Sequence, residues 1–177
     1  YLIEQVQKSE DHNINSSKSV KLNFNHPVKE LIWVGQRNQA ITTTYSKNAD
    51  NYSDYNDLFN YTSSASISKK FNMFESFVLQ LNGMDLFSER EPQYFNMYVP
   101  YRHHTRAPDV GVFVHTFSEN PEEYQPSGTC NFSRLDSAVL KYNLNGLGPG
   151  PKLLKVYAVN YNILEIKGGQ CALAYTH

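Results

Sequence analysis

The chain has 177 residues and a formal net charge of −1 at pH 7. That length suits a single domain, here expected over residues 1–177, and is long enough to bury a substantial core. Acidic and basic residues are interspersed, so the sequence gives no sign of a nucleic-acid-binding surface or a polybasic membrane contact. No run of about 18 apolar residues occurs, so no transmembrane helix is predicted.

Composition favours β-structure. Aromatic residues make up 14% of the chain, and Asn recurs throughout, whereas Ala and Leu are too sparse for a helical protein. The two cysteines, Cys130 and Cys171, are too few for a disulfide framework and lack a paired metal-ligand spacing. We therefore expect two reduced, largely buried thiols.

The N-terminal part predicts three strands, at 2–7, 20–24 and 28–36. The second shows the clean alternation of a half-exposed strand. The third holds the apolar run around Trp33, which is short enough to be covered on both faces. As the only tryptophan, Trp33 is expected to anchor the core.

Residues 37–70 form the longest irregular stretch and are rich in Asn, Ser, Thr, Tyr and Asp. A loop of that length in a compact domain is usually functional or external. We expect a long surface loop between the third and fourth strands, packing through its aromatic side chains.

The middle of the chain predicts a hairpin. A strand over 77–81 ends at Asn82-Gly83, the strongest short hairpin signal, and a return strand over 84–88 follows. Residues 89–98 are expected to form one or two helical turns. Residues 99–108 are expected to be loop.

A sixth strand is predicted at 110–117, and a sharp corner comes next. Pro126 fixes φ and Gly128 can adopt the positive φ that reverses the chain. From Phe132 to Leu144 the apolar residues recur at every second position, which predicts one long strand. Arg134 and Asp136 lie two residues apart on its apolar face and could pair with each other or with neighbouring groups. We expect them to fix the corner.

With a final strand at 153–166, the count is eight and the class is all-β. Eight antiparallel strands in a chain of this size favour a two-sheet jelly-roll sandwich. An immunoglobulin-like sandwich is the alternative, but the Cys-Trp-Cys spacing of that fold is missing.

Catalytic and metal-binding motifs are weak. His103 and His104, with His115 and Glu119 downstream, are the only histidine cluster, but adjacent histidines on an extended chain point to opposite sides. No nucleophile elbow, His-Glu-x-x-His motif or phosphate-binding glycine loop occurs. We therefore expect no catalytic residue, metal or cofactor. The expected role of Arg102, His103, His104 and Arg106 is a basic loop at a surface or subunit contact.

Three segments are similar to one protein family. They are Leu22-Asn-Phe-Asn-His-Pro-Val-Lys-Glu-Leu-Ile-Trp-Val, the stretch from Leu79-Gln-Leu-Asn-Gly to Tyr94-Phe-Asn, and Tyr124-Gln-Pro-Ser-Gly-Thr-Cys-Asn-Phe-Ser-Arg-Leu-Asp. With Val156-Tyr-Ala-Val-Asn-Tyr-Asn-Ile-Leu and the Leu173-Ala-Tyr tail, they resemble the C-terminal half of the major capsid protein of nucleo-cytoplasmic large DNA viruses. The resemblance covers nearly the whole chain and fails mainly across 37–70.

This resemblance implies a double jelly roll, of which the chain would be the second barrel and a piece of a longer protein. Three copies would form a homotrimeric, pseudo-hexameric capsomer that tiles an icosahedral shell. It implies a structural protein of the virion that is assembled in the host cytoplasm. Minor capsid proteins and an adjacent internal viral membrane are further expected partners.

Two other functions stay open from the residues alone. A jelly-roll carbohydrate- or receptor-binding module could use the tyrosines of 37–70 to stack on sugars, although exposed tyrosines also suit protein interfaces. A metal-dependent cupin enzyme requires a different histidine geometry from the one expected here.

Overall fold

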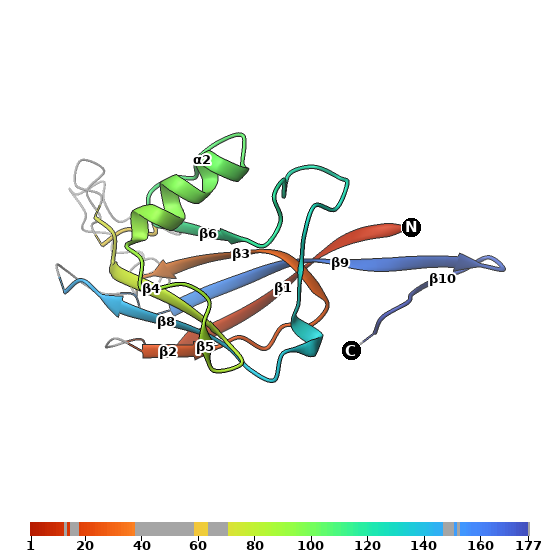
Figure 1. The fold of residues 1–177 in the computed structure, drawn as a ribbon, viewed down its shortest axis with the longest axis horizontal. Helices are drawn as coiled ribbons and strands as arrows, with labels where there is room; N and C mark the ends of the chain where they lie inside the picture. Colours follow the sequence, from red (N-terminus) through yellow and green to blue (C-terminus); the bar gives the residue numbers. More distant parts are fainter. Residues whose placement is uncertain are drawn as a thin grey trace, which may run out of the picture.

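The structure is a computed structural model that describes residues 1–12, 14, 18–37, 59–63, 71–146, 151 and 153–176. Over these residues the chain forms ten strands in two antiparallel sheets (Figure 1). The predicted all-β, two-sheet architecture is confirmed. Most of the predicted long loop at 37–70 lies outside the described residues, so that prediction stays untested.

The first sheet contains the three longest strands, β1 (Leu2–His12), β9 (Leu153–Lys167) and β3 (Pro27–Gln36). Its order is β1, β9, β3 and β6 (Val112–Thr116), with β7 (Cys130–Asn131) added to β3 and β10 (Gln170–Leu173) added to β9. The second sheet has the order β2 (Lys18–Lys21), β8 (Ala138–Leu144), β4 (Phe74–Leu81) and β5 (Met84–Asp85). The chain therefore passes repeatedly from one sheet to the other.

The predicted strand count of eight differs from the ten strands observed. The strand expected from Phe132 to Leu144 is interrupted, because Phe132–Arg134 form a 3₁₀ turn, η4, between β7 and β8. Asn131 Oδ1 accepts a hydrogen bond of 3.1 Å from the Ser133 backbone N–H and caps this turn. The apolar alternation holds only from Ala138 onward.

The predicted hairpin after β4 is confirmed. Asn82 and Gly83 both have positive φ, at 50° and 79°, as a two-residue type I′ turn requires. Leu81 pairs with Met84 directly across the turn.

An aromatic core lies between the sheets. Trp33 is 1% exposed, and its ring centroid lies 5.2 Å from that of Phe77 and 5.1 Å from that of Phe95. Phe74 and Phe113 pack at 5.7 Å in the same cluster. The prediction that Trp33 anchors the core is confirmed.

A helical segment covers the core beside β6. A π-helical turn, η3 (Tyr94–Tyr98), runs directly into α2 (Val99–His103), and the segment buries Phe95 and Val99. The helical prediction for 89–98 is confirmed in part, but the loop predicted from residue 99 was wrong. Pro100 lies in the first turn of α2, directly after the π-helical turn, and the helical backbone continues through it. No helix of the described residues is long and apolar enough to cross a membrane.

Strand β9 extends past the ends of its neighbours and carries β10 as a two-stranded arm (Figure 1). Cys171 lies in this arm and is exposed, whereas Cys130 is partly buried, and neither forms a disulfide. The expectation of largely buried thiols was therefore wrong for Cys171, because β10 packs against no second layer.

Candidate functional site

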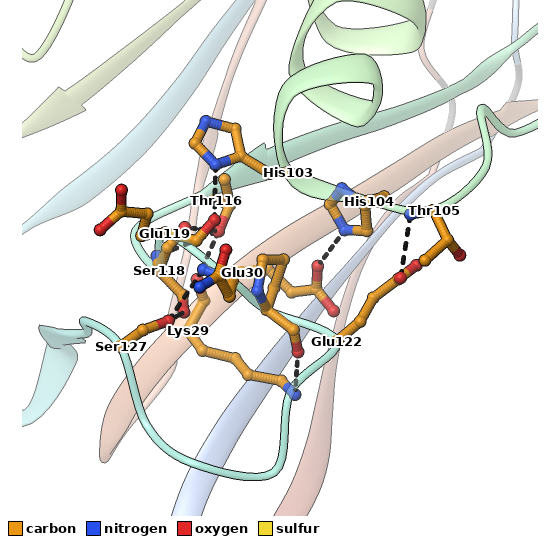
Figure 2. Close-up of polar contacts among 12 residues, drawn as sticks. Lys29, Glu30, His103, His104, Thr105, Thr116, Ser118, Glu119, Glu122 and Ser127 are labelled. Carbon is orange, nitrogen blue, oxygen red and sulfur yellow. Dashed lines mark hydrogen bonds and ion pairs between the residues drawn. The ribbon is translucent and has the colours of Figure 1, made fainter.

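A polar cluster joins α2, β3 and the loop that follows β6 (Figure 2). It contains two of the four residues predicted as a basic surface loop, His103 and His104. His103 is the last residue of α2, and His104 caps the helix in extended conformation. The premise that both histidines lie on an extended chain was therefore wrong. Arg102 and Arg106 are exposed beside them.

His104 contacts the sheet through Glu30. Its Nε2 lies 2.9 Å from Glu30 Oε2, with the two side chains 14% and 12% exposed. His104 Nδ1 is buried and has no hydrogen-bond partner among the described residues. The contact attaches the end of α2 to the middle of β3.

A bulge in β3 places Lys29 beside Glu30. The register between β3 and β9 shifts between Val28 and Glu30, which leaves Lys29 without a pairing partner on β9. Its Nζ contacts Glu4 Oε1 at 2.5 Å and donates to the Pro121 carbonyl oxygen at 2.7 Å. The buried ammonium group is satisfied within the chain and ties β1 and the loop after β6 to β3.

The loop after β6 is held to α2 by two further bonds. His103 Nδ1 lies 2.8 Å from the Glu119 carbonyl oxygen, and Glu122 Oε2 accepts a bond of 2.9 Å from the Thr105 N–H (Figure 2). The Thr105 N–H lowers the pKa of Glu122 below its usual value. These bonds join residues that are about 16 positions apart in sequence.

His115 lies in β6 near His103. It packs against Phe87 and Phe117, with ring centroids 5.2 and 5.0 Å away. Burial lowers the pKa of His115 from 6.5 to about 4, and the nearby His103 adds to the effect. Within the described residues, His, Cys, Asp and Glu form no group of three that could hold a metal ion.

Gly128 has the positive φ expected at the predicted corner. Gly128 has φ 143°, and a Cβ atom there would lie 2.6 Å from the Phe117 carbonyl oxygen. Ser127 Oγ lies 2.7 Å from Ser118 Oγ and accepts a bond from Asn120 N–H at 2.8 Å. Pro126 precedes this pair and is exposed.

The structure does not pair Arg134 with Asp136. Both side chains are exposed, and no ion pair joins them. Asn82 holds this part of the backbone instead. Its Oδ1 accepts hydrogen bonds of 2.8 and 3.3 Å from the N–H groups of Asp136 and Ser137. The turn of the β4–β5 hairpin thus holds the start of β8.

Residues that the sequence interpretation missed lie on the outer face of the helical segment. Met97, Tyr98 and Tyr101 are 60%, 52% and 83% exposed. The four-residue spacing of Met97 and Tyr101 was a signal for one helical face, but Pro100 concealed it.

A cleft of about 580 Å³ lies at the other end of the helical segment. Its wall contains three carboxylates, from Glu75, Glu89 and Glu91, and one cation, Arg90. Glu89 accepts hydrogen bonds from Ser76 and Asn143.

Most polar groups of the cluster bond to other residues of the chain, whereas the helix face and the cleft present groups to the outside. Exposed Tyr, Met and Arg side chains are the types enriched at protein interfaces. The arrangement therefore suits the binding of a surface.

Comparison with known proteins decides the family. Residues 1–172 match the family of large eukaryotic DNA virus major capsid proteins. The chain belongs to this family. The capsid resemblance seen in the sequence is thus confirmed.

Several viral major capsid proteins are similar to this family member over its whole length. Those of Phaeocystis pouchetii virus and Pyramimonas orientalis virus are 37% and 38% identical to it. The chain covers 48% and 43% of those proteins, so it spans about half the length of the curated relatives it matches.

Solved structures agree. A quasi-atomic model of the PBCV-1 virus capsid superposes with a TM-score of 0.76 at 30% identity, over 100% of this chain and 51% of that one. The Faustovirus major capsid protein, at 18% identity and a TM-score of 0.77, shares the fold. This major capsid protein family member therefore has the capsid-type β-sandwich.

Proposed function

We propose that the chain is one jelly roll of a double-jelly-roll major capsid protein, a structural component of an icosahedral virus shell. The observation that carries the proposal is the strand order. The two four-strand paths, β1-β9-β3-β6 and β2-β8-β4-β5, contain eight strands shared between two sheets, as in a jelly roll. Strands β7 and β10 lie off these paths and pair with the inner strands β3 and β9 of the first sheet.

The proposal assigns a geometric role and no catalysis. A shell needs identical, rigid building blocks with repeatable contacts. The aromatic core and the internally satisfied cluster around Lys29 and Glu30 support rigidity. Three copies of the full-length protein would form a pseudo-hexameric capsomer.

The proposal also covers the contacts of the capsomers and the place where they assemble. We expect capsomers to contact each other, minor capsid proteins and, on the inner side, a viral membrane. We also expect assembly in the host cytoplasm. Family membership supports these expectations.

Light scattering coupled to size-exclusion chromatography of the full-length protein tests the proposal, with electron microscopy of the same fractions. The expected result is a trimeric species that forms hexagonal arrays when concentrated. A protein that stays monomeric and forms no array contradicts it.

A further inference from the structure

The helical segment presents an unusual outer face near its C-terminal end. Met97, Tyr98 and Tyr101 are more than half exposed, while the opposite side of the segment packs into the core through Phe95 and Val99. Large apolar and aromatic side chains gathered on one exposed face mark interaction surfaces. The face therefore has the composition of an interface core.

This face ends in positive charge. Arg102 and Arg106 are exposed, and neither forms an ion pair with another described residue. The neighbouring Glu122 accepts its bond from the Thr105 backbone and leaves both guanidinium groups available. We call Tyr101, Arg102 and Arg106 the basic end.

The opposite end of the segment is hollow and acidic. The cleft of about 580 Å³ is lined by Glu75, Glu89 and Glu91 together with the apolar residues Phe71 and Pro92. Glu75 and Glu91 are exposed and form no ion pair with another described residue. We call this hollow the acidic cleft.

The two surfaces lie at opposite ends of one rigid element. Glu91 lies just before the helical turns and Arg102 lies in the last turn of α2 (Figure 1), so about 15 Å of helix separates them at 1.5 Å per residue. This spacing is too long for the two surfaces to pair directly within one copy, so both stay available to a second one.

We propose that the basic end of one copy docks into the acidic cleft of a second copy of this chain. The inference rests on the proposed function, which supplies the second copy. The contact joins two different patches and is therefore heterologous, and such a contact closes into a ring when the rotation between copies permits. Tyr101 and Met97 supply apolar contact with Phe71, which is 51% exposed. The opposite charges of the two surfaces orient the copies and make the contact specific.

Charge reversal in the full-length protein tests this contact. The basic-end variant is R102E/R106E, the cleft variant is E75K/E91K, and a third protein carries all four substitutions. Each two-residue variant is expected to raise the dissociation constant for self-association about tenfold or more, because like charges then face each other. The protein with all four substitutions restores opposite charges and is expected to return to within about threefold of wild type.

A matched control reverses two charges elsewhere. Lys21 and Glu165 are exposed on β2 and β9 and lie outside both surfaces, so K21E/E165K is expected to assemble like wild type. Sedimentation velocity gives the dissociation constants, and circular dichroism confirms that each variant is folded.

The outcomes separate this inference from the proposed function. A wild type that assembles, with two-residue variants that assemble equally well, overturns the docking contact alone. Failure of the four-residue protein to recover while folded also overturns it. A wild type that does not self-associate overturns the proposed function and the contact with it.

Discussion

His104 Nε2 lies 2.9 Å from Glu30 Oε2, and this contact joins residues 74 positions apart. Replacing His104 with Ala leaves a largely buried carboxylate without its partner. We expect a loss of about 1–3 kcal/mol in the free energy of unfolding, measured by urea denaturation at pH 7. His12→Ala serves as control, because His12 is 67% exposed. Equal stability of the two variants would contradict a structural role for the contact.

Acid should destabilise the protein through His115. Its pKa is lowered from 6.5 to about 4 in the folded chain, so between these values the unfolded state binds more protons. Stability is therefore fully present above about pH 6.5 and is lost as pH falls toward 4. The difference between the two pKa values corresponds to about 3 kcal/mol in the free energy of unfolding. Denaturant unfolding from pH 7 to 4 measures the loss, and His115→Gln should show a clearly shallower pH dependence than wild type.

Gly128→Ala should destabilise the corner after β6. Positive φ disfavours any side chain there, and the added Cβ would also lie 2.6 Å from the Phe117 carbonyl oxygen. Gly146→Ala separates the two effects, because Gly146 has φ 66° but a Cβ added there would meet no atom within 4 Å. We expect Gly146→Ala to lower the free energy of unfolding by about 1 kcal/mol and Gly128→Ala by about 2 kcal/mol or more. Thermal and urea unfolding measure which variant is less stable. Equal losses of stability in the two variants would exclude a steric effect of the Cβ atom at position 128.

Asn82, and not Arg134, should carry the stability of the turn before β8. Asn82→Gly tolerates the positive φ but removes the acceptor for two backbone N–H groups. We expect it to cost about 1 kcal/mol, whereas Asn82→Asp keeps the acceptor and should cost less. Arg134→Ala should change stability by less than about 0.5 kcal/mol, because Arg134 is exposed. A larger effect of Arg134→Ala in urea denaturation would restore the role first expected for it.

Local patterns predicted the parts of the fold that depend on neighbouring residues. The hairpin at Asn82-Gly83 and the core position of Trp33 follow from turn chemistry and apolar runs. The helical segment was missed beyond residue 98, because Pro100 normally ends a helix but is tolerated in a first turn. The 3₁₀ turn at Phe132–Arg134 was missed because its residues fit the strand alternation by coincidence.

The candidate site was harder to predict, since its partners are distant in sequence. The four basic residues were assigned to a surface contact, but the attachment of His104 to Glu30 depends on how β3 and α2 pack. Arg134 and Asp136 were expected to fix the corner because they are close in sequence. In the fold, Asn82 bonds to the backbone N–H of Asp136, although the two residues are 54 positions apart in sequence.

The position of β9 has a mechanical consequence. This strand is hydrogen-bonded to β1 through eleven residue pairs and to β3 on its other edge. A force that pulls β1 along its own axis therefore acts on many bonds at once, in shear, and cannot open them singly from one end. The sheet is therefore hardest to extend along the direction of β1 and β9.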